Sequence, residues 1–270
     1  MPSEDPRPNK ISRRKSLGKV TTRQDIFCTL GGLPFIDASF DIDVLISLIA
    51  TKRAKFAKEH NSNSPTHYLT PQFACYALRI RTPGLPILPH WTSLSGDEMQ
   101  RVGGALSYIE ENWPEFCGYR RLPMQFGKWL SDRTSVTNPF EPQVVLLGNK
   151  AFRDDFTLVE SLIHEVAHVW LGLVAELRDF QNNKDPGEFV LPSGTTGKTA
   201  RGVVFAAHFA ASVISFIRSS TLSRHEWWRP RAAHLQWYLA GCLELANLST
   251  HLSITGLEIT ERLKAQLVPI

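Results

Sequence analysis

The stretch TLVESLIHEVAHVWLGL, residues Thr157–Leu173, decides the fold of the second half of the chain. Its apolar residues follow a helical pattern, which predicts one long helix over 155–180. Inside it lies an HExxH motif. Four residues along a helix return to within about 40° of the same direction, so His164 and His168 point to one side and can share a metal ion. Glu165 is turned by about 100° and can reach a metal-bound water without being a ligand.

Apolar patterning predicts further helices around this one, at 41–60, 97–112, 199–218, 230–248 and 254–267. The Val-Val-Leu-Leu run at 144–147 is the best candidate for a strand, and the run at 73–80 fits a helix or a strand equally well. We therefore expect a mainly α fold: a helical C-terminal core with an HExxH helix, short β elements and a loop-rich N-terminal part.

Charge is unevenly distributed along the 270 residues. The formal net charge is +4, and residues 1–25 alone carry seven basic and three acidic residues, so the remaining chain sums to zero. A neutral body does not indicate a nucleic-acid-binding surface. We expect a flexible basic arm at 1–25, an N-terminal part without a recognisable motif at 26–142, and a helical metal-binding catalytic core at 143–270.

Several sequence features bear on the compartment. The basic N-terminus lacks the apolar segment of a signal peptide. The most apolar stretch, Val203–Phe216, is shorter than the ~18 unbroken apolar residues of a membrane helix and contains His208. The four cysteines form no CxxC pair, which indicates reduced thiols rather than a disulfide or zinc framework. These features predict a cytoplasmic protein with no membrane partner.

The third metal ligand decides the chemistry, because two imidazoles do not hold a catalytic metal alone. The metzincin pattern HExxHxxGxxH fails at Leu171 and Val174, and the aspzincin pattern GTxxD fails at Lys198. Glu188 follows His168 by 20 residues, as in gluzincins, but it lies in a loop with Pro and Gly on both sides.

His208 is the better candidate for the third ligand. It lies 40 residues after His168 in the next predicted helix, which would return antiparallel and face the same metal. The alternative is a buried histidine bonded to a backbone carbonyl or to Ser212. Arg201 lies seven residues before His208 on the same helix face, and it or Lys198 could clamp the far carboxylate of an anionic co-substrate. The alternative for Arg201 is a side chain in solvent.

The HExxH helix, the following loop and the segment RGVVFAAHF at 201–209 resemble those of a known family, the HExxH-containing peptide-modification proteins. The resemblance covers about residues 143–267. It implies a β-hydroxylase of peptides that depends on Fe(II) and 2-oxoglutarate, with a ribosomal precursor peptide as the type of substrate. In place of that family's Pro-Trp-Arg loop element, this chain has Pro-Ser-Gly at 192–194, so Lys198 or Arg201 would have to bind the co-substrate.

Two functions from different chemistry stay open. In the first, His164, His168 and His208 hold iron in an oxygenase, and Glu165 lies beside the metal without acting as a base. In the second, a zinc peptidase, zinc lowers the pKa of a bound water to ~7, Glu165 takes its proton, and the strand at 144–147 is the sheet edge that pairs with substrate. A binding protein with a degenerate site is a third alternative, against which the intact motif argues.

Overall fold

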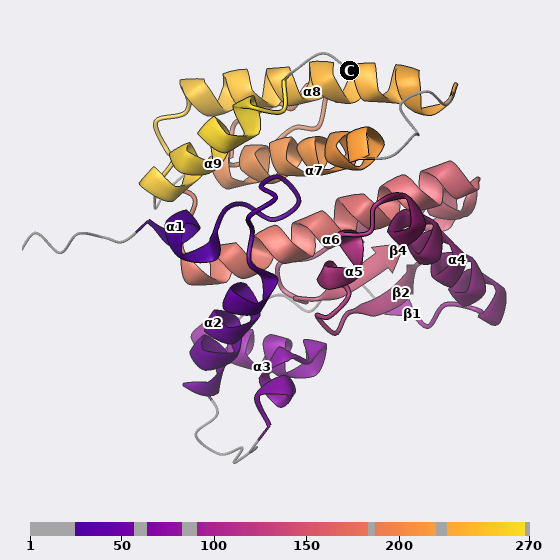
Figure 1. Ribbon diagram of the computed structural model, residues 1–270, viewed down its shortest axis with the longest axis horizontal. Coiled ribbons are helices and arrows are strands. Elements are labelled where there is room, and N and C mark those ends of the chain that lie inside the picture. Colours follow the sequence, from indigo (N-terminus) through magenta and orange to yellow (C-terminus); the bar gives the residue numbers. More distant parts are fainter. Residues whose placement is uncertain (1–24, 57–63, 83–90, 183–186, 220–225, 268–270) are drawn as a thin grey trace, which may run out of the picture.

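The computed structural model describes residues 25–56, 64–82, 91–182, 187–219 and 226–267. It is mainly helical, with 61% helix and 8% strand, as predicted (Figure 1). The basic arm predicted at 1–25 lies outside the described residues except for Asp25, which caps the first helix.

The first half of the chain supplies short helices. These are α1 (Ile26–Leu30), α2 (Ile42–Ala54), the 3-10 helix η1 (Pro65–Leu69), α3 (Pro71–Arg81), α4 (Gly96–Asn112) and α5 (Phe116–Tyr119). Their starts have clear local causes. Asp41 accepts a hydrogen bond from Val44 N at the start of α2, and Ser95 and Glu98 form a reciprocal capping box at the start of α4. The ambiguous run at 73–80 is helical, within α3.

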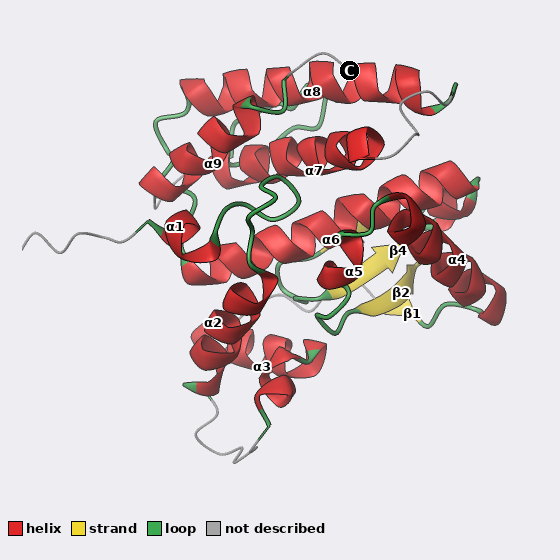
Figure 2. Ribbon diagram, viewed as in Figure 1, coloured by secondary structure: helices red, strands yellow, loops and turns green. Residues whose placement is uncertain are grey.

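A small mixed sheet packs against the HExxH helix through β3 and β4. Its strands are β1 (Trp91–Thr92), β2 (Gln125–Trp129), β3 (Ser135–Thr137) and β4 (Val144–Leu147), in the order β1-β2-β4-β3. Figure 2 labels three of them, β1, β2 and β4. The predicted strand at 144–147 is therefore real, but its predicted place at the edge is wrong. β4 pairs with β2 in parallel and with β3 antiparallel, and all four of its residues are buried. An all-apolar strand is typical of the sheet interior, and β1 and β3 are the edge strands.

Three long helices and a shorter one form most of the second half. They are α6 (Asp155–Leu177), α7 (Ala200–Ser219), α8 (Trp228–Leu248) and α9 (Ile254–Lys264), all close to the predicted ranges; a short 3-10 helix, η2 (Asn149–Phe152), precedes them. α6 starts at Asp154, whose carboxylate accepts the Thr157 N–H at 2.7 Å.

α6 is the central helix of the molecule. The sheet, α2 and α4 pack on one side of it, and α7, α8 and α9 form the layer on the other side (Figure 1). One main apolar core contains residues from Ile26 to Leu263, so it draws on both parts of the chain that the sequence separated at residue 143.

α6 and α7 are long and apolar enough to cross a membrane by length and composition. However, 78% of the apolar window of each helix is buried inside the molecule, as in the core helices of a folded domain.

Candidate metal centre

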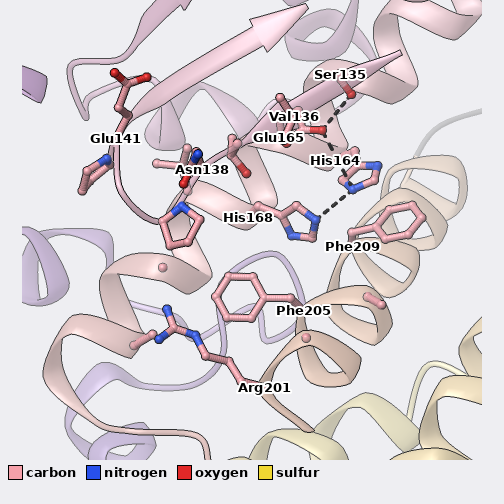
Figure 3. A pocket seen from close by; sticks show the side chains of 18 of the residues that line it. Ser135, Val136, Asn138, Glu141, His164, Glu165, His168, Arg201, Phe205 and Phe209 are labelled. Atoms are coloured by element: carbon pink, nitrogen blue, oxygen red, sulfur yellow. Dashed lines mark hydrogen bonds and ion pairs between the residues drawn. The ribbon is translucent and has the colours of Figure 1, made fainter. Parts of the chain in front are cut away.

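The two histidines of α6 converge on one point. His164 Nε2 and His168 Nε2 are 2.8 Å apart, and both rings point into a pocket (Figure 3). Burial lowers the pKa of each imidazole to about 3, so both are neutral near pH 7. A neutral ring with its lone pair directed at a shared point is what a metal ligand requires. The pair therefore fits two ligands of one metal ion.

Two phenylalanines of α7 close one side of this pair. The Phe209 ring stacks on the His164 ring with centroids 3.8 Å apart and planes 6° apart. Phe205 lies 5.6 Å from the His168 ring centroid. These residues are four apart on one helix and so share a face. They hold the imidazoles in place and keep this side of the site apolar.

Glu165 is tied to the sheet edge. Its Oε1 accepts the Ser135 hydroxyl at 2.7 Å and lies 4.0 Å from His164 Nε2. Burial raises the pKa of Glu165, while hydrogen bonds from Ser135 and Thr137 oppose that rise. Ser135 and Thr137 are two apart on β3 and therefore face the same way. Oε2 of Glu165 is buried and has no hydrogen-bond partner among the described residues.

The structure gives His208 a different environment from the one expected of a ligand. It is fully buried, its Nε2 lies 2.9 Å from the Pro34 carbonyl oxygen, and it is not among the groove-lining residues. Since a carbonyl oxygen only accepts, Nε2 carries the proton. In the described part of the chain no group of three His, Cys, Asp or Glu side chains is placed to hold a metal. His208 as third ligand stays a prediction, and it requires the ring to leave Pro34.

The angular positions of the α7 residues explain why His208 does not face the groove. The α7 residues that line the groove include Gly202, Phe205 and Phe209, spaced by three and four. His208 precedes Phe209 by one residue, or about 100°, and so faces Pro34 instead. Arg201 lies seven residues before His208 and therefore at almost the same angle on α7. Its side chain is long enough to line the groove all the same.

Arg201 and Lys198 both line the groove that contains the histidines. The Arg201 Cζ lies 5.3 Å from the Phe205 ring centroid, and the side chain extends into the pocket (Figure 3). Burial lowers the pKa of Arg201. The negative charge of Asp179, which lies beyond ion-pair distance, partly opposes that shift. Lys198 lines the same groove as the two histidines, and its positive charge makes a small contribution to the lowering of their pKa values. Glu188 does not line the groove.

The groove follows one face of α6. It encloses about 1230 Å³, and its α6 wall runs from Thr157 to Glu176 with the histidine pair near the middle. At 1.5 Å per residue this wall is about 28 Å long. Edge strand β3 and the residues on either side of it, 133–143, also line the groove. The volume exceeds the range of about 300–1000 Å³ that is usual for small-molecule sites.

The sequence did not predict the hydrogen-bond partner of Glu165. Ser135 lies in a three-residue strand 30 positions before Glu165. The hydroxyls of Ser135 and Thr137 at alternate positions were the one available signal for a polar strand face.

No family model matches this chain, and a search of the curated proteins finds no match.

Proposed function

We propose that this protein is a non-heme Fe(II)/2-oxoglutarate-dependent oxygenase that hydroxylates an unactivated C–H of a peptide. The observation that carries the proposal is the presence of Arg201 and Lys198 in the groove that contains the histidine pair. Both cations are half-buried, and no carboxylate among the described residues lies at ion-pair distance from either, which favours an anionic ligand. An anion beside a metal is the arrangement that a dicarboxylate co-substrate needs.

Each residue has a distinct part in this proposal. His164 and His168 would hold the metal, with His208 as the predicted third ligand. Lys198, which lines the same groove as both imidazoles, would neutralise the carboxylate next to the metal, and the planar Arg201 guanidinium would clamp the far carboxylate.

The overall reaction of such an oxygenase has a fixed stoichiometry. Fe(II), when bound, supplies O2 activation, and one O2, one 2-oxoglutarate and one R–H give succinate, CO2 and R–OH. Phe205 and Phe209 would keep water away from the reacting C–H. Glu165, held by donors from β3, would stabilise the site from beside the metal rather than accept a proton.

The length of the groove favours a peptide over a single amino acid as substrate. An extended chain rises about 3.3 Å per residue, so about 28 Å of groove accommodates roughly eight residues. The reacting residue would lie in the middle, opposite the histidine pair.

A zinc peptidase is the second candidate, and one observation favours it. The free edge of β3 borders the groove, where a peptide could add as a further strand, and the unpartnered Oε2 of Glu165 could receive a proton from a metal-bound water. The hydrogen bond from the Ser135 hydroxyl, which holds Glu165 to β3, counts against a role as a mobile base.

The two candidates are separated by one experiment with two arms. The purified protein is incubated in air with Fe(II), 2-oxoglutarate and a random peptide mixture, and succinate is measured by mass spectrometry. The parallel arm contains Zn²⁺ without 2-oxoglutarate and measures new peptide amines. Succinate formation that depends on Fe(II) supports the oxygenase. Zinc-dependent cleavage without succinate would reverse the ranking.

A further inference from the structure

The groove extends beyond the histidine pair to α3. Its far end is lined on α6 by Leu173 and Glu176. Its opposite wall there comes from Phe56, just after the end of α2, and from Ala74, Ala77 and Leu78 of α3. Glu176 follows His168 by eight residues, which is about 12 Å along the helix. This end therefore lies well away from the proposed metal.

Ion pairs and ring contacts fix the position of this end. The buried Arg53 of α2 pairs with Glu176 through Nη2 and Oε1 at 2.6 Å. Phe56 follows three residues later, and the Arg81 Cζ of α3 lies 5.9 Å from its ring centroid. The C-terminal parts of α2 and α3 thus lie together beside the last turns of α6.

The wall formed by α3 is apolar except for Arg81, which also lines the groove, and it is separate from the main core. Phe73 and Ala77 form a second buried cluster, against which Phe56, Tyr68 and Tyr76 pack. Leu78, one residue after Ala77, is half-buried and lines the groove. An apolar wall in a binding groove, outside the core, suits an apolar group of the ligand.

We propose that Phe56, Ala74, Ala77 and Leu78 form a specificity subsite, the α3 subsite, for a large apolar side chain of the substrate peptide. An extended peptide covers about 12 Å in three to four residues, so this side chain belongs three to four positions from the residue that reacts. The inference rests on the proposed function for the position of the reacting residue. The continuity of one groove from the histidines to α3 identifies the occupant as part of the same peptide.

The subsite is tested by a binding selection that needs no turnover. The full-length protein is incubated with a bead-bound library of random nonapeptides, and the retained beads are sequenced. Wild type is expected to enrich Leu, Ile, Phe or Met at one position by about tenfold, the scale set by burial of one such side chain. Leu78→Glu places a carboxylate in the subsite and is expected to shift that preference to Lys or Arg.

A matched substitution on the same helix provides the control. Ile80 is 47% exposed and does not line the groove, so Ile80→Glu should keep the apolar preference. A change from apolar to basic selection cannot result from unfolding. The subsite is refuted if wild type retains no peptide or shows no apolar preference, or if Ile80→Glu shifts the preference as much as Leu78→Glu. Absence of succinate in the activity assay would instead refute the oxygenase proposal, and it would not affect the result of the peptide selection.

Discussion

At the residue scale, the site consists of two neutral imidazoles at one point, a carboxylate held from β3 and two cations from the α7 side of the groove. Each group is positioned by a contact outside the HExxH motif. Phe209 stacks on His164, Ser135 holds Glu165, and Phe205 lies between Arg201 and His168. The motif sets the spacing of the two histidines and the glutamate, and these neighbours set the directions of their side chains.

Glu165→Gln distinguishes the two candidate chemistries. The amide keeps an oxygen that can accept the Ser135 hydroxyl, so the fold and the metal site are expected to persist. Succinate formation should stay within about tenfold of wild type, whereas loss of a general base costs a peptidase about 10²–10⁴-fold. The check is the rate of succinate release measured by mass spectrometry. A loss of 10³-fold with intact iron binding would contradict the role assigned to Glu165.

Arg201→Leu is expected to weaken 2-oxoglutarate binding by about 10- to 100-fold, the usual value of hydrogen bonds to a charged group. The measurement is a calorimetric titration of 2-oxoglutarate into the anaerobic Fe(II) form. Arg229→Leu is the control, because Arg229 is exposed on α8 and does not line the groove. Equal affinities for the Arg201 variant and wild type would remove Arg201 from the co-substrate site.

At the scale of elements, α6 joins the two halves of the molecule, and the buried ion pair of Arg53 with Glu176 fastens α2 to it. Arg53 is 1% exposed and also donates to the side-chain oxygen of Gln143, just before β4. This network connects α2, α6 and the sheet at one end of the groove. Its loss should therefore affect stability more than chemistry at the histidines.

Arg53→Met is expected to lower the free energy of unfolding by about 3 kcal/mol, because it leaves the largely buried Glu176 carboxylate without its partner. Arg121→Met is the matched control. Arg121 pairs with Asp43 in solvent, where an ion pair contributes about 0–1 kcal/mol. Urea unfolding followed by circular dichroism measures both. If both variants lost a similar amount of unfolding free energy, the buried network would contribute no more to stability than the surface ion pair.

Helices were the predictable elements, and the sheet was not. The periodicity of 155–180 and the apolar run of 199–218 are local signals, and both helices are present. The order of strands depends on pairings between distant segments, so the sequence does not reveal that β4 lies inside the sheet. His208 shows the same limit. The sequence gives the angle between His208 and Phe209 on α7, but the packing against α6 decides which of them faces the histidine pair.

At the scale of the whole molecule, the buried His208 makes stability depend on pH. Burial lowers the pKa of His208 to about 4, below its ordinary value of 6.5. Between these values the unfolded chain binds a proton that the folded chain does not, so stability falls as the pH falls below 6.5. The wild-type metal-free protein should lose on the order of 2 kcal/mol from this residue between pH 7 and pH 5.

His208→Gln should flatten this pH dependence by that amount, because glutamine does not titrate. Urea unfolding at pH 7 and at pH 5, with a chelator present, gives the comparison. If the stability of the variant changed with pH as much as that of wild type, the His208 ring would bind a proton as readily in the folded chain as in the unfolded chain.

The central claim is that His164 and His168 hold one metal ion in the groove. Equilibrium dialysis of the full-length protein against Fe(II) under anaerobic conditions tests it most directly. Wild type should retain one iron per chain, and the His164→Ala and His168→Ala variants should each retain far less at the same free concentration. Equal iron in wild type and in both variants would contradict the account, whatever the activity measured in other assays.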